Sequence, residues 1–195
     1  CALRSGSETV VCNDCGETVS TTEIPALEHN YVDGTCSNCG EAEPTQGEGT
    51  YVEATSIAVG DTIIIVSKDA GMELSSFSTT STVYGIGTAY TDIPAGTMTW
   101  TVEEGAVAGS YAFKNADGNY LYWSAGNSLK ASATKDAQSS WNVTFDGNDV
   151  ILVIAGTSDV ARHVAWNSGS PRFANYKDST ISGQTTYYTI QFYKY

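Results

Sequence analysis

The sequence predicts an all-β protein, in which a small zinc-ribbon-like unit precedes a larger β-trefoil-like barrel. Three observations lead to this prediction: a series of short apolar stretches after residue 50, a pattern that recurs within them, and two Cys-x-x-Cys pairs near the start. Short alternating runs separated by Asp-Gly, Gly-Asn and Ser-Gly are typical of strands and tight turns. No convincing run has the helical period of 3.6 residues.

The two cysteine pairs have the spacing of a four-thiolate zinc site. Residues 1–43 are too few to build a stable core without a staple, so we predict one structural zinc ion. Two disulfides remain the alternative in an oxidising compartment. His29 is a fifth candidate ligand, although four thiolates already complete a tetrahedral site. The predicted ligands are Cys12, Cys15, Cys36 and Cys39.

The segment between the pairs carries Ile24-Pro-Ala-Leu27, His29 and Tyr31-Val-Asp-Gly34, and a glycine follows each cysteine pair. Over residues 11–43 it resembles a repeat of large surface proteins of gut Firmicutes, which usually have Gly where Glu28 stands. The resemblance implies a secreted or cell-surface bacterial parent with tandem modules, and no catalysis. Residues 19–24 are expected to form a strand and Asp33-Gly34 a turn. Cys1 is interpreted as the remnant of a preceding repeat, with a free thiol or the first residue of a lipoprotein as alternatives.

Composition narrows the range of partners. The chain has 195 residues and a net charge of −13, and residues 51–195 alone carry thirteen acids against eight bases. Nucleic acid is not an expected partner, because phosphate contacts need clustered Lys and Arg. Membrane insertion is not expected either, since no apolar stretch reaches about 18 residues. Without a start methionine or signal peptide, the chain is expected to be a mature product or an excised piece. Residues 44–50, acidic and containing Pro and Gly, are the predicted linker.

A recurring pattern predicts the fold of residues 51–195. Trp100-Thr-Val102, Trp141-Asn-Val143 and Tyr188-Thr-Ile190 share the order aromatic, polar, β-branched, and each closes a block of four strand candidates. Three such blocks indicate a β-trefoil, in which six strands close a barrel and three hairpins cap it. A β-sandwich is the alternative. The three aromatic residues are expected at equivalent, buried places. The predicted strands are 62–67, 72–77, 83–90, 98–102, 110–115, 120–123, 128–131, 141–145, 150–155, 163–166, 172–176 and 187–193.

Several stretches of this part also resemble, more loosely, an all-β accessory module of secreted enzymes and surface proteins of gut Bacteroidetes and Firmicutes. They include Gly118-Asn-Tyr-Leu-Tyr122, Ser140-Trp-Asn-Val143, the segment 162–173 and Gln191-Phe-Tyr-Lys194. The resemblance implies a noncatalytic, accessory role.

No catalytic constellation is evident in residues 51–195. His163 is their only histidine, and the nearby Asp159 and Arg162 do not make a triad. Neither a G-x-S-x-G nor an H-E-x-x-H motif occurs. The Asp-rich segments 115–119 and 146–149 faintly resemble calcium loops but lack EF-hand spacing, so we interpret them as hairpin turns. The sequence therefore predicts that the protein is not an enzyme, with a hydrolase fragment or accessory hydrolase domain as an alternative.

Aromatic residues provide the better functional lead, because sugar rings stack on flat aromatic faces. The chain has twelve Tyr and four Trp. Strand alternation places Tyr120 and Tyr122 opposite Leu121, and Arg172 and Tyr176 opposite Phe173. The predicted partner is a glycan or glycoprotein surface, and the alternative is a structural spacer or adhesin module without a small ligand. Trefoil lectins often have Gln where Met98 and Ser139 stand, so a ricin-type site is disfavoured. The candidate ligand-binding residues are Tyr120, Tyr122, Trp123, Trp166, Asn167, Arg172 and Tyr176, of which Trp123 and Trp166 could instead be core or barrel-mouth residues.

Overall fold

The computed structural model describes the backbone of residues 6–11, 18–24, 31–32 and 35–36, and residues 51–81, 83–91, 94–156 and 162–195. The chain divides into two compact units, residues 1–48 and 49–195, and each is described by itself. No helix among these residues is long and apolar enough to cross a membrane.

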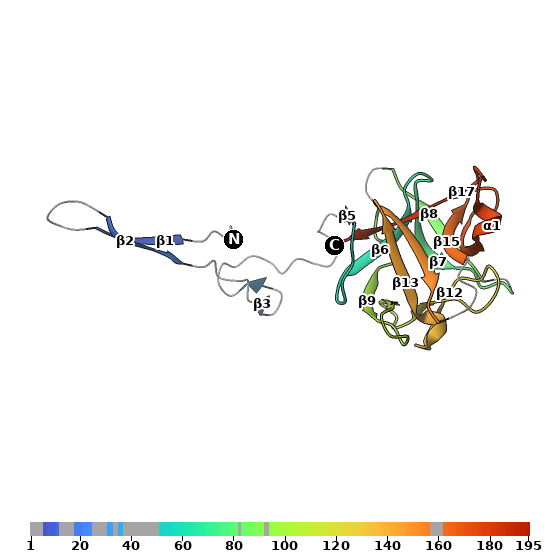
Figure 1. Cartoon of the computed structure of the whole chain (residues 1–195), viewed down its shortest axis with the longest axis horizontal. Coiled ribbons are helices and arrows are strands. Elements are labelled where there is room, and N and C mark those ends of the chain that lie inside the picture. Colours follow the sequence, from blue (N-terminus) through green and yellow to red (C-terminus); the bar gives the residue numbers. More distant parts are fainter. Residues whose placement is uncertain are drawn as a thin grey trace. The chain divides into compact units, whose positions relative to one another are not determined.

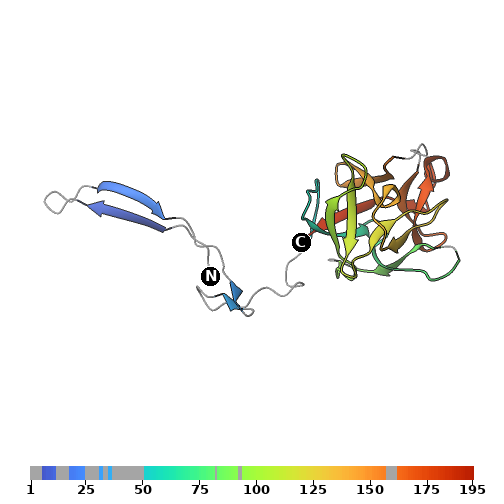
Figure 2. The ribbon, with the colours of Figure 1, turned by 90° about the horizontal axis from the view of Figure 1, so that it is seen from below.

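The described residues of the first unit form two pairs of antiparallel strands, drawn in blue in Figure 2. Strands β1 (Gly6–Val11) and β2 (Thr18–Ile24) form one, which confirms the strand expected at residues 19–24. Strands β3 (Tyr31–Val32) and β4 (Thr35–Cys36) form the other. The turn predicted at Asp33-Gly34 lies outside the described residues. Of the predicted zinc ligands, Cys36 is described by its backbone alone, and Cys12, Cys15 and Cys39 lie outside the described residues, as does His29.

Six antiparallel strands of the second unit close into a barrel (Figure 1). Each strand pairs with the next one in the ring, and the last, β18, pairs back with the first, β6. A closed ring leaves no strand edge exposed for pairing with another chain. The ring consists of β6 (Thr62–Ser67), β9 (Trp100–Glu104), β10 (Tyr111–Asn115), β13 (Trp141–Asp146), β14 (Asp149–Ile154) and β18 (Ile190–Lys194).

Three hairpins cap this barrel: β7 (Met72–Phe77) with β8 (Gly85–Ala89), β11 (Tyr120–Tyr122) with β12 (Lys130–Ser132), and β15 (Arg162–Asn167) with β16 (Arg172–Lys177). A six-stranded barrel with three capping hairpins is a β-trefoil, so the β-trefoil predicted for residues 51–195 is confirmed. All twelve predicted strands are present, although the last divides into β17 (Tyr187–Tyr188) and β18. The sequence did not predict β5 (Val52–Glu53), the 3-10 turn Ala137–Ser139 or α1 (Asp178–Ile181).

The apolar run of β6 is continuous because both of its faces are covered. Ile63 and Ile65 lie in the main core inside the barrel. Ile64 and Val66 lie on the other face, where Tyr51, Tyr90 and Tyr193 pack over them. Alternating residues of one strand point to opposite faces, so a strand that is covered on both sides needs apolar residues at every position.

The structure corrects one part of the predicted repeat. Trp100 and Trp141 are fully buried, opposite Ile63 and Tyr111 respectively. The matching place in the third repeat, opposite Val150, is occupied by the fully buried Ile190 and not by Tyr188. The sequence pattern aligned the aromatic residues, whereas the strand register aligned the residues that fill the core. Tyr188 instead lies in β17, half-buried, and pairs with Trp166 of β15.

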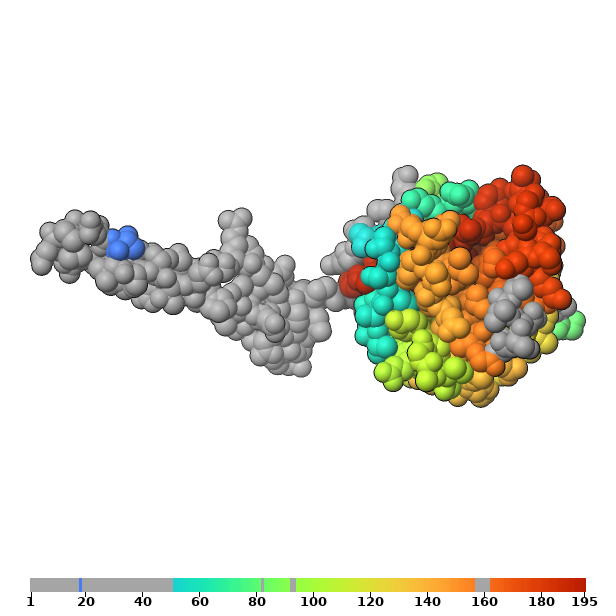
Figure 3. All heavy atoms as spheres, in the orientation of Figure 1, coloured from blue at the N-terminus to red at the C-terminus, as the bar shows by residue number. Residues whose placement is uncertain are grey.

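Contacts between hairpins hold the cap together. Gly85 of β8 pairs with Phe173 of β16, and the Leu129 amide donates to the Val83 carbonyl at 3.0 Å. A Cβ atom at Gly85 would lie 2.5 Å from Leu74 Cδ1 and 2.9 Å from Phe173 Cβ. Only glycine therefore allows the first and third hairpins to approach this closely. In Figure 3 the first repeat (cyan to green) and the third (orange to red) adjoin accordingly.

Candidate functional site

The outer face of the second hairpin carries Tyr120 and Tyr122, as strand alternation predicted, but both rings are covered. Their exposed fractions are only 9% and 8%. Lys114 and Lys135 lie 5.8 and 5.5 Å from the centre of the Tyr120 ring, and Lys130 lies 4.9 Å from that of Tyr122. The expectation that these rings face solvent as open stacking surfaces is therefore wrong, because lysine side chains cover their faces.

Hydrogen bonds fix the same two tyrosines at their hydroxyl ends. The Tyr120 hydroxyl donates to Glu103 Oε2 at 3.1 Å, and the Tyr122 hydroxyl donates to Asp136 Oδ2 at 3.2 Å and to Gln138 Oε1. Lys135 also lies 2.8 Å from Glu103 and, through this contact above all, holds the pKa of that carboxyl below its ordinary range. These contacts give both tyrosines a structural role on the outside of the barrel.

Trp123 and Arg162 meet at one backbone carbonyl. Trp123 is half-buried against the core, and its indole N–H donates to the Gly126 carbonyl at 2.8 Å. Arg162 Nη1 donates to the same oxygen at 2.8 Å, and to Asn127 Oδ1 at 2.9 Å. The loop of the second hairpin is thus tied to the first strand of the third.

The third hairpin confirms the alternation predicted around Phe173. Phe173 is buried in the core, and Arg172 and Tyr176 lie together on the opposite face, where Arg172 Nε donates to the Tyr176 hydroxyl at 3.3 Å. This face is also covered: Arg172 lies 5.4 Å from the centre of the Tyr84 ring, and Tyr187 packs edge-on against Tyr176 at 4.9 Å. Tyr176 is only 1% exposed.

Two polar residues of the same hairpin have partners nearby. The side-chain oxygen of Asn167 accepts the Ser170 amide at 3.1 Å and shapes the turn that follows β15. Nδ1 of His163 lies 2.7 Å from Asp178, the first residue of α1. Asp159 lies outside the described residues. Both contacts are local and hold the ends of the hairpin.

Trp166 is the predicted site residue that reaches an open hollow. Its ring packs on the core beside Phe173, with 4.9 Å between ring centres, and only 5% of the residue is exposed. The hollow has a volume of about 440 Å³. It lies between the β6–β7 turn of the first repeat and the β15–β16 turn with β17 of the third. Its lining consists of Asp69, Ala70, Met72, Trp166, Ser168, Pro171 and Tyr188.

Local backbone geometry positions these aromatic residues. Trp166 and Tyr188 are direct partners in the register of β15 and β17. A Cβ atom at Gly87 would lie 2.7 Å from the Trp166 ring and 2.9 Å from Met72 Cε, so glycine on β8 provides the space for both side chains. The Ser168 amide donates to the Thr186 carbonyl at 2.8 Å and ties the β15–β16 turn to the residue before β17. The hollow is therefore built into the fold.

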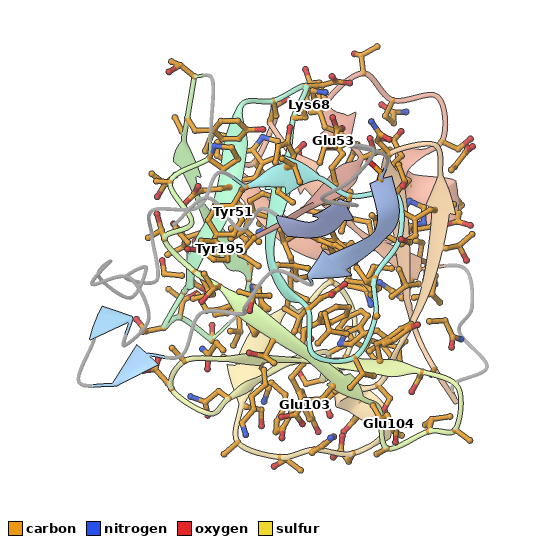
Figure 4. All side chains as sticks on the ribbon, turned by 90° about the vertical axis from the view of Figure 1, so that its left-hand side faces the viewer. Tyr51, Glu53, Lys68, Glu103, Glu104 and Tyr195 are labelled. Carbon is orange, nitrogen blue, oxygen red and sulfur yellow. The ribbon has the colours of Figure 1, made fainter. Side chains whose placement is uncertain are left out.

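Asp69 is the one charged residue of this lining. It is exposed, and its carboxylate makes no hydrogen bond or ion pair with another residue in the part of the chain that the structure describes. The neighbouring Lys68 is held by another carboxylate, because its Nζ lies 2.7 Å from Glu53 Oε2; both residues are labelled in Figure 4. The hollow thus combines two aromatic rings with an unpaired carboxylate.

A second hollow of about 420 Å³ lies at the β9–β10 turn. Small residues and backbone form most of it, and Tyr111 is its one aromatic residue. Among the described residues, no group of three or more His, Cys, Asp or Glu side chains is placed to hold a metal ion.

Most residues of the hollow beside Trp166 were not predicted from the sequence. Asp69 and Met72 precede Trp166 and Tyr188 by about a hundred positions, and no local pattern links the two segments. The pair Tyr187-Tyr188 was visible, but Tyr188 was assigned to the core by the repeat alignment. Alternation along β17 would have separated these two side chains, since Tyr187 contacts Tyr176 and Tyr188 lines the hollow.

No family model and no curated protein matches this chain. Solved structures do. A protein described as BEL β-trefoil is 16% identical, with a TM-score of 0.53 over 73% of this chain and 99% of that one. A Polyporus squamosus lectin, bound to a human-type influenza-binding epitope, is 17% identical, with a TM-score of 0.54 over 70% of this chain and 50% of that one. A salivary protein from Culex quiquefasciatus is 19% identical, with a TM-score of 0.50 over 73% and 98%. At these identities the likeness establishes the fold alone.

Proposed function

We propose that residues 51–195 are a noncatalytic glycan-binding module and that the hollow beside Tyr188 is its sugar site. One observation carries this proposal: Trp166 and Tyr188 are paired across two strands next to the unpaired carboxylate of Asp69. Aromatic rings receive the apolar C–H face of a sugar, and a carboxylate accepts hydrogen bonds from its hydroxyls. Concave sites with apolar walls and a few polar groups are the usual form of small-ligand sites.

The hollow suits one sugar residue better than a long chain. Its volume of about 440 Å³ lies at the small end of the usual range for ligand pockets. Trp166 contributes little area because most of its ring packs on the core, so Tyr188 and Met72 provide the remaining apolar contact. We expect a dissociation constant of roughly 0.1–1 mM for one site, with avidity supplied by tandem modules of the parent chain.

Fold analogy and the sequence resemblances support this proposal. The Polyporus lectin was solved with a bound glycan epitope, although the match covers only 50% of that lectin's chain, and the analogy concerns glycan binding as such and not the choice of sugar. The resemblances described above suggest a secreted or cell-surface bacterial parent with several modules. We propose the same context for this chain.

The test uses two neighbouring tyrosines that face opposite ways. Tyr188→Met removes the ring from the hollow and supplies the residue type found at Met98 of the first repeat. Tyr187→Met makes the same change on the opposite face, against Tyr176. Glycans from plant, mucin and host sources are screened on an array, and hits are titrated by calorimetry.

We expect Tyr188→Met to weaken binding about tenfold or more, since loss of a stacked ring costs about 1–3 kcal/mol in comparable stacking contacts. Tyr187→Met should leave affinity within about twofold. The reverse result would move the site to the face of Arg172 and Tyr176. No binding to any glycan would favour the structural spacer.

For residues 1–43 we propose a structural zinc ion held by the four cysteines. The support is their spacing and the small size of the unit. Metal analysis of the purified chain should find about one zinc per chain, and Cys12→Ser should abolish it while the barrel still unfolds cooperatively. Two intact disulfides by mass spectrometry, with no zinc, would overturn the proposal.

A further inference from the structure

We infer that the hollow selects neutral sugars and discriminates against anionic glycans, those that carry sialic acid, uronic acid or sulfate. This inference rests on the proposed glycan site and names its ligand class. Asp69 contributes a negative charge, and no lysine or arginine belongs to the lining.

The nearest cations in sequence are engaged away from the hollow. Lys68 forms its ion pair with Glu53, at 2.7 Å. Arg172 follows Pro171 of the lining, but its side chain lies on the opposite face of the hairpin, against Tyr84 and Tyr176. Of these cations only Lys68 interacts with Asp69, weakly and through charge alone, because Glu53 holds its ammonium group. A carboxylate or sulfate entering the hollow therefore meets Asp69 with no lysine or arginine in the lining.

The free carboxylate also favours a particular feature of a neutral sugar. A carboxylate has two oxygens that only accept hydrogen bonds, so it can receive two hydroxyl groups at once. Adjacent free hydroxyls on one sugar ring present two donors at a suitable spacing. The Ser168 hydroxyl donates to the Thr186 carbonyl at 3.2 Å and retains lone pairs for a further donor. Asp69 and Ser168 therefore both offer acceptors, which suits a ligand rich in hydroxyl donors.

Long-range charge acts in the same direction. Residues 51–195 carry thirteen acids and eight bases, so the module repels anions before contact. Because Asp69 is exposed, salt screens its repulsion, and we expect a penalty of about fivefold near physiological ionic strength.

The experiment compares matched glycans that differ only in charge. Neutral oligosaccharides and their sialylated, sulfated or uronic acid counterparts are printed on one array, and the best neutral binder and its anionic counterpart are titrated in solution at low and high salt. The variants are Asp69→Asn and, as a matched control, Asp117→Asn, which changes another exposed aspartate in the β10–β11 turn.

Neutral glycans should bind at least about fivefold more tightly than their anionic counterparts, and the gap should narrow at high salt. Asp69→Asn should weaken the binding of neutral glycans about tenfold, because a charge-assisted acceptor becomes a neutral amide. It should also reduce the difference in affinity between neutral and anionic glycans. Asp117→Asn should change neither the affinity for neutral glycans nor the difference between neutral and anionic glycans. Anionic glycans that bind as well as neutral ones, or a gap that survives Asp69→Asn, would overturn the inference while leaving the glycan site intact. Absence of binding by both classes would overturn the proposed function as well.

Discussion

The two equivalent tryptophans of the barrel should respond differently to the same substitution. Trp100 and Trp141 are both fully buried, and each opens a barrel strand. The indole N–H of Trp141 donates to the Leu121 carbonyl at 2.9 Å. The indole N–H of Trp100 has no acceptor among the described residues. Replacing each with phenylalanine therefore separates the hydrogen bond from the packing.

The packing loss is similar at the two positions. Exchange of an indole for a smaller ring in a close-packed core costs about 2 kcal/mol, a fraction of the 3–5 kcal/mol expected for Trp→Ala. At Trp141 the loss of a hydrogen bond adds about 1 kcal/mol. At Trp100 the substitution removes a buried donor that has no partner, and this offsets about 1 kcal/mol of the packing loss. We expect Trp141→Phe to cost about 3 kcal/mol and Trp100→Phe about 1 kcal/mol.

Urea unfolding of residues 47–195, monitored by circular dichroism, measures the free energy of unfolding of each variant against that of the unsubstituted chain. The expected difference of about 2 kcal/mol corresponds to about 4–8 °C in melting temperature for a domain of this size. Equal losses at the two positions would refute the assignment of the Trp141 hydrogen bond as the distinguishing contact. A larger loss at Trp100 would show that its donor is satisfied in solution.

Three further predictions concern the tyrosine clusters and the hollow. Glu103→Gln should cost about 1 kcal/mol at neutral pH, because Lys135, Tyr120 and Lys114 lower the pKa of Glu103 and so stabilise the folded state. This stabilisation is complete above the ordinary glutamate pKa and is lost as pH falls through the lower folded pKa, so the acid unfolding curves of wild type and variant should converge below that folded value. Burial raises the pKa of Tyr90 to about 12, so stability should decline from about pH 10 upward, where the tyrosine ionises first in the unfolded chain. Tyr90→Phe should reduce this loss of stability in equilibrium unfolding at alkaline pH, and an unchanged dependence of the unfolding free energy on pH would contradict the prediction. Gly87→Ala should displace Trp166 and cost about 1–3 kcal/mol, whereas Gly169→Ala, whose nearest neighbour would lie at 3.4 Å, should change stability by less than about 0.5 kcal/mol.

The strands were predictable because their signals are local. The twelve stretches alternate or are uniformly apolar, and turn residues separate them. Asp146 pairs with Asp149 across Gly147, whose φ of 64° is one that glycine adopts readily. Strand alternation also predicted which side chains share a face, as Leu121 and Phe173 show. The three-block pattern was sufficient to choose the barrel over the sandwich.

Exposure was not predictable from the same alternation. Tyr120, Tyr122 and Tyr176 do lie opposite the core residues beside them, but other segments then cover them. Lys130 and Lys135 reach Tyr122 and Tyr120 from neighbouring segments, and Tyr187 reaches Tyr176 from another strand. A long amphipathic side chain can shield a ring while its charge stays in water. Alternation identifies the face of a strand, and the tertiary neighbours decide whether that face is open.

The departure from threefold symmetry coincides with the hollow. The position two residues before Trp100 holds Met98, which packs on the core, and the position two before Trp141 holds Ser139, which is buried and caps a 3-10 turn. Two residues before Ile190, the same position holds Tyr188, and there it lines an open site. Barrel closure needs a core residue at the first position of each pattern, which a tryptophan or an isoleucine provides. The position two residues earlier is free to vary with its surroundings. The third repeat is therefore the one in which an aromatic residue at this position meets an unpaired carboxylate from another repeat, and a Tyr188→Met variant should restore the pattern of the first repeat at the expense of ligand binding alone.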